Sequence, residues 1–422
     1  MNVLHVVHGY APAIGGTEFL FQRISEELVA RYGDRVTVYT TNGYTTGFFV
    51  DPSLPAIPIR EGETLNGVEI HRFPVNNRIA PRLFDLQSKA FARNWPLNDV
   101  LRTLYHGPIS GPMFAALLRA QADVIAASSF PLLHMYYAAV GKRFNRLPLV
   151  FCGALHPGDR WAYDRPIIYK AIASCDVYVA YTTFERDFVV SRGFPADRVR
   201  IASPGVDPAP FAAADGTALR RALGWEDAPV IAFVGQQAAH KGIDVLYAAM
   251  RRVWQRVPAA RLIVAGGRTI YSPQLDRLLD SFSPQERERI HLITNFSEEE
   301  KPAIFAACDV FVSPSGYESF GITFIEAWAA GKPVIGCRSG AIPAVIDEWE
   351  DGLLVPYGDA SQLASAILEL LTDDALRERL ARRGREKVLA QHTWEIAVAR
   401  FRQAYEQAAD QRRGRINHKG YM

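Results

Sequence analysis

The stretch that decides the fold of the second half of this chain is Val230–Val257, V-I-A-F-V-G-Q-Q-A-A-H-K-G-I-D-V-L-Y-A-A-M-R-R-V-W-Q-R-V. Its first five residues form a short apolar run that is typical of a strand buried on both faces. Residues 235–242 predict a loop. The apolar residues that follow recur at the spacing of one helical face and predict a helix over Ile243–Val257. The members of this stripe are Ile243, Leu246, Met250, Val253 and Val257.

The same alternation of strand and helix runs through both halves. In the first half, Val3–Val7 predicts a strand, a loop ends in Gly15 and Gly16, and a helical segment leads to a second strand at Val36–Tyr39. Strands that alternate with helices in this way predict a doubly wound parallel sheet. Two such series predict an α/β protein with two Rossmann-like domains that face each other across a cleft. Further strands are expected at Leu262–Ala265, Ile290–Ile293, Val310–Ser313, Pro333–Gly336 and Leu353–Val355.

The length of the chain and its prolines indicate where the domains divide. A chain of 422 residues exceeds what one hydrophobic core usually organises. Prolines and small residues gather at Ser203–Phe211 and predict a linker, so we expect domains at 1–207 and 208–394. A last helix, about 395–410, is expected to pack back on the first domain. The basic residues of 411–422 predict a frayed, solvated tail.

The composition limits the class of protein. Apolar residues make up 49% and charged residues 22%, as in soluble globular proteins. The net charge of +2 gives no argument for binding nucleic acid. Because the chain opens on a strand-like run without a signal peptide and lacks an apolar stretch of roughly 20 residues, we expect a cytoplasmic protein. Four widely spaced cysteines predict buried thiols rather than disulfides or a zinc site: Cys152, Cys175, Cys308 and Cys337.

Lys241 stands at the amino-terminal end of the helix predicted after residue 242. The positive end of the helix dipole makes a lysine there unfavourable unless an anion lies between the two. Glycines at 235 and 242 allow the backbone to approach a phosphate. From this segment alone, a phosphate-binding loop and a solvated surface lysine both remain open.

A second loop carries a more specific pattern. After the strand at Val310–Ser313, residues 314–334 read P-S-G-Y-E-S-F-G-I-T-F-I-E-A-W-A-A-G-K-P-V. Open α/β sheets bind ligands at this end of a strand, and we expect the next helix to start near Ser319 or Phe320. Glu318 then precedes the helix and Glu326 lies about two turns in, roughly 12 Å along its axis. A retaining glycosidase pair needs about 5 Å, so these carboxylates suit instead the two ends of one long ligand.

These segments resemble the family 4 glycosyltransferases. Glu318 and Glu326 match the E-x7-E signature of that family, within the pattern P-S-x-x-E-S-F-G-x-x-x-x-E-A-x-A-x-G-x-P-V. The resemblance covers about residues 3–410 and implies the GT-B fold, a nucleotide-sugar donor and retention of the anomeric configuration. Other family motifs match in chain order: G-G-x-E at Gly15–Glu18, a strand ending in histidine at Leu147–His156, G-V-D at Gly205–Asp207 and K-G at Lys241–Gly242.

The resemblance implies that Lys241 and a set of backbone amides bind the donor diphosphate. Such donors stabilise the charge of the leaving group without a metal, and the sequence contains no D-x-D triplet. No metal and no cofactor is therefore expected. The amides are those of Phe320, Gly321, Ile322 and Thr323.

The remaining donor contacts are also implied by the resemblance. Glu318 would hold hydroxyls of the transferred sugar and Glu326 the ribose. Asn295 and Phe296 would border the base, while His156 and Gly16 would close over the sugar and phosphate. The expected catalytic residues are Lys241, Glu318 and His156.

Several of these residues have simpler interpretations. His156 is also explained as a polar residue at a strand end, Gly16 as a turn, and Phe296 as ordinary core. Gln236 stands where the family usually has arginine, which leaves a second basic contact to the diphosphate in doubt; His240 is a candidate to supply it. This departure motivates an alternative function, a non-catalytic nucleotide-sugar-binding subunit. An epimerase or a phosphorylase of the same fold is a further alternative.

The acceptor is the least defined partner, with a glycan, a lipid-linked acceptor and a small molecule all open. Residues 72–119 carry seven basic residues and two aspartates, interleaved with aromatic ones. One hypothesis is that this region contacts the inner face of a membrane. The other is that the aromatic residues pack into the domain and the basic ones are solvated. The basic residues are Arg72, Arg78, Arg82, Lys89, Arg93, Arg102 and Arg119.

Overall fold

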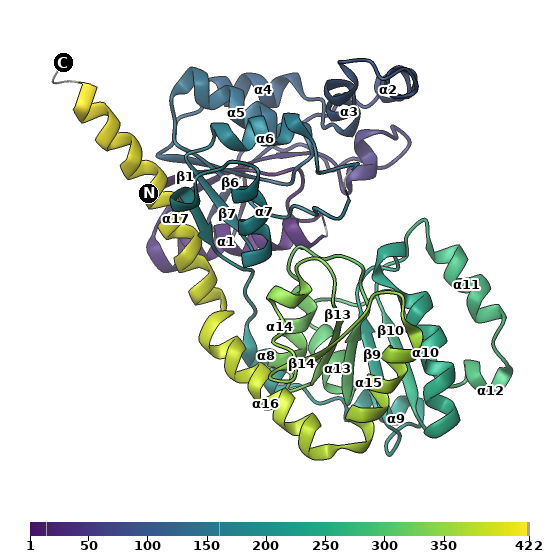
Figure 1. The fold of residues 1–422 in the computed structure, drawn as a ribbon. Coiled ribbons are helices and arrows are strands. Elements are labelled where there is room, and N and C mark those ends of the chain that lie inside the picture. Colours follow the sequence, from purple (N-terminus) through teal and green to yellow (C-terminus); the bar gives the residue numbers. More distant parts are fainter. Residues whose placement is uncertain (14, 160, 420–422) are drawn as a thin grey trace. The chain divides into compact units, whose positions relative to one another are not determined.

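The computed structural model describes residues 1–13, 15–159 and 161–419, with side chains up to Arg412. The chain divides into two compact units (Figure 1). Unit 1 comprises Met1–Ser203 and the segment from Trp394 onward, and unit 2 comprises Pro204–Thr393. These boundaries lie a few residues before the expected ones, at 207 and 394.

Unit 1 is built on an eight-stranded sheet with the order β3-β4-β2-β1-β5-β6-β7-β8. All neighbours are parallel except β3 and β4. In register, Val3 of β1 lies opposite Val36 on one side and Val124 on the other. The strands are β1 Asn2–Val6, β2 Arg35–Thr41, β3 Glu63–Leu65, β4 Val68–Phe73, β5 Val124–Ser128, β6 Leu149–Cys152, β7 Val177–Ala180 and β8 Val199–Ile201.

Helices cover the sheet of unit 1 because its central strands are apolar on both faces. One face of β5 to β7 packs on α4, α5 and α6 in a continuous core that includes Phe151 and Met135. The helices are α1 Gly16–Tyr32, α2 Ala80–Ala92, α3 Asn98–His106, α4 Gly111–Leu118, α5 Leu133–Asn145, α6 Pro166–Ser174 and α7 Thr183–Ser191, with short 3-10 turns η1 Thr46–Phe49 and η2 Ala196–Arg198.

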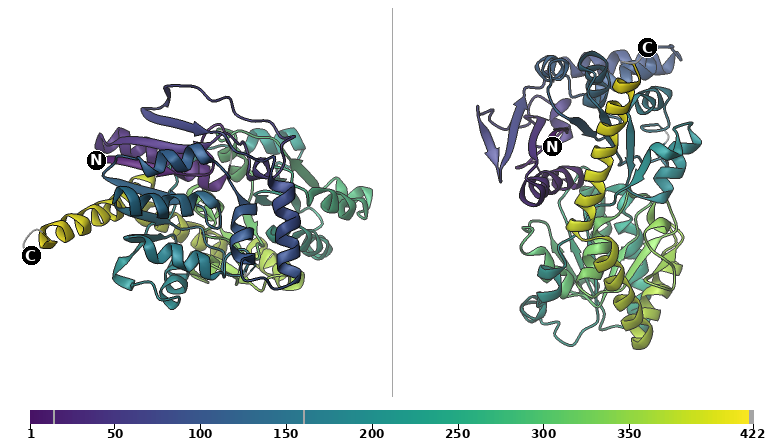
Figure 2. Two further views of the ribbon diagram at one scale, coloured as in Figure 1. Left: turned by 90° about the horizontal axis from the view of Figure 1, so that it is seen from above. Right: turned by 90° about the vertical axis from the view of Figure 1, so that its left-hand side faces the viewer.

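The last helix, α17 (Trp394–Lys419), returns to unit 1 and contacts α1 and the strands β5 to β8 (Figure 2). Its Tyr405 ring lies against His5 of β1, and Phe401 lies against Tyr181. The expected end at Asp410 is wrong, because the helix continues to Lys419. Its closing residues contain no proline that would end the helix, and arginine is a good helix former. Of the expected tail, 420–422 lie outside the described residues.

Unit 2 contains a six-stranded parallel sheet with the order β11-β10-β9-β12-β13-β14. The chain builds outward from β9 through β10 to β11, then crosses back and builds from β12 to β14. The point between β9 and β12 is therefore a topological switch point, where such sheets bind ligands. The strands are β9 Val230–Val234, β10 Arg261–Ala265, β11 Ile290–Ile293, β12 Val310–Ser313, β13 Val334–Cys337 and β14 Gly352–Val355.

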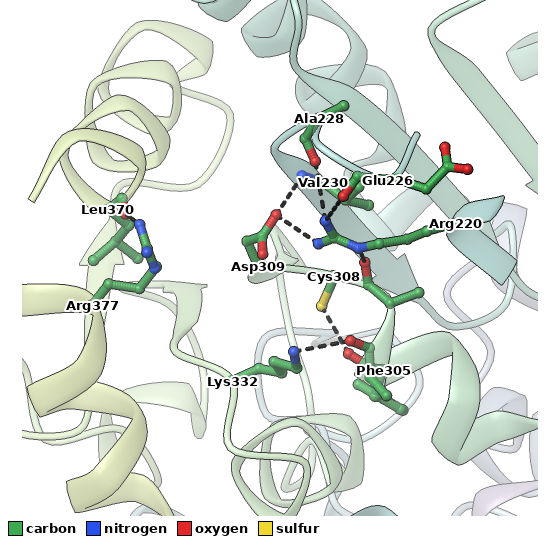
Figure 3. A network of polar contacts seen from close by, with 12 residues as sticks. Arg220, Glu226, Ala228, Val230, Phe305, Cys308, Asp309, Lys332, Leu370 and Arg377 are labelled. Atoms are coloured by element: carbon green, nitrogen blue, oxygen red, sulfur yellow. Dashed lines mark hydrogen bonds and ion pairs between the residues drawn. The ribbon is translucent and has the colours of Figure 1, made fainter. Parts of the chain in front are cut away.

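The amino-terminal ends of β9 and β12 are tied together by a polar network (Figure 3). Asp309 Oδ2 accepts hydrogen bonds of 2.8 Å from the Val230 amide and from Arg220 Nη2. Lys332 Nζ donates to the carbonyl of Ala306 at 2.9 Å.

The helices of unit 2 are α8 Pro208–Ala213, α9 Thr217–Leu223, α10 Ile243–Arg256, α11 Ser272–Asp280, α12 Pro284–Arg287, α13 Lys301–Ala306, α14 Ile322–Ala329, α15 Ala360–Thr372 and α16 Asp374–Gln391, with 3-10 turns η3 Ala239–Lys241 and η4 Ile342–Ala344.

Two expectations from the composition can be compared with the structure. The four cysteines are buried and form no disulfide, as predicted. Among the described residues, no helix has both the length and the apolar character needed to cross a membrane.

Candidate functional site

The two loops at the switch point of unit 2 bring Lys241 and Glu318 together. Lys241 ends the turn η3 after β9, and Glu318 lies in the loop after β12. Lys241 Nζ donates to Glu318 Oε1 at 2.6 Å, and their side chains are only 19% and 13% exposed. The two motifs found separately in the sequence therefore form one ion pair.

A close approach of the two loop backbones makes this pairing possible. Gly242 has a left-handed φ of 68°, and a Cβ atom there would lie 2.3 Å from the carbonyl oxygen of Pro314. The Gly316 amide donates to the carbonyl of His240 at 2.7 Å, and the His240 ring stacks on Tyr317 with centroids 4.5 Å apart. A glycine is thus required at 242 both by its backbone angle and by the neighbouring loop.

The charge of Glu318 is set by its surroundings. Burial alone would raise the pKa of this carboxyl, but the charge and hydrogen bond of Lys241, with a contribution from the Ser315 hydroxyl, bring that pKa below its ordinary value. The carboxylate is therefore ionised at neutral pH. A ligand that enters here meets a half-buried cation and a half-buried anion side by side.

Helix α14 begins later than expected, at Ile322 rather than near Ser319 or Phe320. Gly321, with a left-handed φ of 89°, forms the N-cap, so the preceding residues cannot belong to the helix. The amides of Ile322 and Thr323 stand in its first turn, where a helix offers no acceptor. Those of Phe320 and Gly321 precede the helix, so the expected set of four amides is split between loop and helix.

Glu326 lies about one turn into α14, roughly 6 Å beyond Ile322, and not two turns in. The estimate of 12 Å from Glu318 does not apply, because residues 318–321 are not helical. Glu326 is 3% exposed, and Lys301 Nζ of α13 donates to its Oε1 at 2.6 Å. Its Oε2 is buried and has no hydrogen-bond partner among the residues that the structure describes. Burial raises the pKa of Glu326 although Lys301 opposes the shift.

Exposed loops carry the residues that were expected to contact the base and the diphosphate of the donor. Asn295 is exposed and Phe296 half-buried in the segment after β11. Phe296 is therefore not ordinary core. Gln236 is exposed directly after Gly235, whereas its neighbour Gln237 is buried.

Gly16 and His156 belong to unit 1, on loops that follow β1 and β6. Gly16 is the first residue of α1, and a Cβ atom there would meet nothing within 4 Å. A Cβ on Gly15 would instead lie 2.4 Å from the Glu18 carboxylate, so Gly15 is the glycine that packing requires. Glu18 is buried beside the loop, with its Oε1 2.9 Å from His8 Nε2.

The predicted strand that ends in histidine is shorter than expected. β6 stops at Cys152, and Ala154 adopts a left-handed φ of 76°, so His156 lies in the loop beyond the strand. The His156 ring meets Tyr163 edge-on, with centroids 5.2 Å apart. The expected strand is therefore wrong in its end, whereas the role of His156 stays a prediction.

Three contributors to the sites were not found by sequence reasoning. They are Lys301, which holds Glu326, the hydroxyl of Ser315 near Glu318, and His8, which holds Glu18. Lys301 follows shortly after Asn295 and Phe296, the residues expected to border the base. This closeness in the sequence is the signal that could have identified it. Within the described parts of the chain, no group of three or more His, Cys, Asp and Glu residues is arranged to hold a metal ion.

Two family models match the two halves of the chain. The model for glycosyl transferases group 1 matches residues 215–387, and the model for a glycosyl transferase 4-like domain matches residues 15–205. A D-inositol 3-phosphate glycosyltransferase of Xylanimonas cellulosilytica is 32% identical over 312 residues, which cover 71% of this chain and 72% of that protein. A GDP-mannose-dependent alpha-(1-6)-phosphatidylinositol monomannoside mannosyltransferase of Mycobacterium tuberculosis is 29% identical over 413 residues, covering 95% and 97%.

A solved structure shares the fold. The Anabaena protein HepE, in complex with UDP and glucose, superposes with a TM-score of 0.72 at 17% identity, covering 96% of this chain and 99% of that one. At this level of identity the likeness concerns the fold alone, which is the GT-B arrangement of two Rossmann-like domains.

Proposed function

The chain belongs to the family 4 glycosyltransferases, and we propose that it transfers a hexosyl group from a nucleoside diphosphate sugar with retention of anomeric configuration. The observation that carries this proposal is the half-buried ion pair of Lys241 and Glu318 at the switch point of unit 2. A sugar diphosphate offers both groups that this pair suits, a phosphate for the ammonium and hydroxyls for the carboxylate.

Lys241 stabilises the leaving group in this proposal. Departure of the nucleoside diphosphate builds negative charge on the phosphate, and the lysine stands ready for it with the first-turn amides of α14. These groups are already oriented, so little reorganisation is needed as the charge develops. The reaction then needs no metal, and a phosphate oxygen of the leaving group accepts the proton of the attacking hydroxyl.

Glu326 holds the ribose in this proposal. Its Oε2 is buried and free to accept a hydrogen bond, while Lys301 fixes the other oxygen. A buried acceptor without a partner is costly, and a ribose hydroxyl would satisfy it. Asn295 and Phe296 border the base.

We propose further that the acceptor is lipid-linked and met at the inner face of a membrane. The exposed residues of α2 and of the segment before α3 form what we call the α2–α3 surface. Its apolar members are between 41% and 64% exposed and are Phe84, Phe91, Trp95 and Leu97. Its basic members are exposed as well and are Arg82, Lys89 and Arg93.

The α2–α3 surface is smaller than the sequence suggested. Arg72 and Arg102 are buried, and Arg72 is paired with Glu63 at 2.6 Å, so neither contributes to it. The alternative that the aromatic residues pack inside the domain is wrong for Phe84, Phe91 and Trp95. Amphipathic surfaces of this kind bind anionic membranes.

One experiment tests the reaction and separates it from the alternative function. UDP-, GDP-, ADP- and TDP-sugars are titrated into the purified protein by calorimetry, and slow hydrolysis of each donor is followed over hours. An active transferase binds one donor class and hydrolyses it slowly, releasing a sugar of the same anomeric configuration. The exposed, uncharged Gln236 favours a non-catalytic binding subunit, which would bind a donor without hydrolysing it. Failure to bind any of the four donors would contradict both functions.

A further inference from the structure

A cavity of about 640 Å³ lies in unit 1, away from the residues assigned to donor and acceptor. Leu147 and Pro148, which lead into β6, and Asp176, which leads into β7, form part of its wall. The cavity is therefore at the amino-terminal edge of the sheet, whereas His156 follows the carboxyl-terminal edge. It has no role in the proposed transfer reaction.

The floor of this cavity is apolar. It is formed by Ala139 and Val140 of α5, by Leu147 and Pro148, and by Ile167 and Ala171 of α6. Val140 is 38% exposed, and Phe144, one turn further along α5, is 67% exposed. Of the floor residues, Leu147, Pro148 and Ala171 are buried, and Ala139, Val140 and Ile167 leave apolar surface open to the cavity. Apolar lining of this kind is typical of ligand pockets.

The rim of the cavity is strongly basic. Arg143, Arg146 and Lys170 are exposed, and in the described part of the chain their side chains form no hydrogen bond or ion pair. Arg412 of α17 adds a further cation. Asp176 is the one carboxylate of the lining, and its charge is matched by Lys142, whose Nζ lies 2.6 Å away.

The position of these cations is not explained by the fold alone. A cation at the end of α5 interacts favourably with the negative end of the helix dipole. That effect accounts for Arg143 but not for Lys170 and Arg412, which come from other helices. Like charges that converge from three helices around one apolar floor repel one another, unless an anion lies between them.

We propose that this cavity binds one molecule of an anionic lipid, with its acyl chain on the apolar floor and its phosphate among Arg143, Arg146 and Lys170. A neutral hydrocarbon would leave the basic rim unused, and an inorganic anion would leave the floor uncovered. An anionic lipid satisfies both. In Figures 1 and 2 the far end of α17 and helix α2 lie on opposite sides of unit 1, so this site is separate from the α2–α3 surface.

Calorimetric titration of the full chain with a lysophosphatidylglycerol, kept below its micelle-forming concentration, tests the proposal. We expect saturable binding of one molecule. The triple variant Arg143→Gln, Arg146→Gln, Lys170→Gln should lose at least about tenfold in affinity, because each basic side chain beside an anionic lipid typically contributes several-fold. Val140→Asp should weaken binding through the floor instead. The matched control is Arg221→Gln, Arg252→Gln, Arg256→Gln, which removes the same charge from exposed arginines of unit 2 and should bind as the wild type does.

Three results would overturn the proposal. Equal affinity for the lysophosphatidylcholine of the same chain length would show that the rim does not select an anion. Equal affinity for glycerol phosphate would show that the floor does not contribute. Equal losses in the rim variant and the control variant would show attraction to the net charge of the protein. The titration involves no sugar donor, so its outcome is independent of the proposed transfer reaction.

Discussion

Each unit has a glutamate near a loop at the carboxyl end of its sheet, but the two side chains are held differently. In unit 1, Glu18 lies beneath its own loop and is held by His8 from the end of β1. Burial would raise the pKa of Glu18, but His8 lowers it below its ordinary value. In unit 2, Glu318 pairs with Lys241 across two loops, 77 residues apart in the chain. Glu18 fills the space beside a loop, and Glu318 forms an ion pair that we propose binds the donor.

This difference shows that a common fold does not assign a common role to a common residue type. The role depends on where the partner of the carboxylate comes from. In unit 1 the partner, His8, comes from the same β1–α1 connection, and Glu18 is buried. In unit 2 the partner, Lys241, follows the neighbouring strand β9, and Glu318 lies at the switch point. Four predictions test this comparison.

The largest effect is expected for Lys241→Ala. Loss of a group oriented toward developing charge typically lowers kcat about 10² to 10³-fold. Steady-state kinetics with the donor identified in the panel would measure this loss, and thermal unfolding would check that the variant is folded. Nearly full turnover in this variant would mean that Lys241 does not stabilise the leaving group.

The two glutamates of unit 2 should be separable. Glu326→Ala removes the proposed ribose acceptor and should weaken binding of the free nucleoside diphosphate by about tenfold or more, since a lost hydrogen bond to a charged group costs about 1.5–3 kcal/mol. Glu318→Ala should leave that binding nearly intact and reduce transfer. Calorimetry with the nucleotide and kinetics with the donor provide the two readouts. If both variants lost nucleotide affinity equally, the assignment of separate roles would be wrong.

The α2–α3 surface of unit 1 should bind anionic vesicles in a salt-dependent way. The variant Arg82→Gln, Lys89→Gln, Arg93→Gln should bind phosphatidylglycerol vesicles roughly tenfold more weakly at low salt, and added salt should narrow the difference. Co-sedimentation would measure it. The control is Arg221→Gln, Arg252→Gln, Arg256→Gln, three exposed arginines of unit 2 that make no ion pair among the described residues. Unchanged binding in the first variant would favour a soluble acceptor.

The smallest effect concerns the glycines that open α1. Gly15→Ala would place a Cβ atom 2.4 Å from the Glu18 carboxylate and should lower the free energy of unfolding by about 1 kcal/mol, through displacement of that side chain. Gly16→Ala meets nothing within 4 Å and should be neutral or slightly stabilising. Urea unfolding of the two variants would measure the difference. Equal destabilisation would show that Glu18 does not support the loop.

Local patterns in the sequence were enough to predict most strands and the chemistry of several loops. β9, β11 and β12 were predicted with the bounds that the structure shows. For β9 and β12 the reason is that a strand buried on both faces requires an uninterrupted apolar run, which is a local property, whereas β11 is a half-buried edge strand that the alternation of strands and helices indicated. Helix starts were less well predicted, because the start of α14 depends on the backbone angle of Gly321, which the apolar pattern does not report.

The sequence by itself thus determined that the chain has two α/β units, and it singled out Lys241, Glu318 and Glu326 as separate candidates. Only the tertiary structure decided their partners. Lys241 meets Glu318 because β9 and β12 are neighbours in the sheet, and Lys301 meets Glu326 because α13 lies beside α14. The basic cavity of unit 1 depends likewise on α17, which joins a sheet begun about 400 residues earlier. Such contacts follow from strand order and helix packing, which link residues that no local pattern connects.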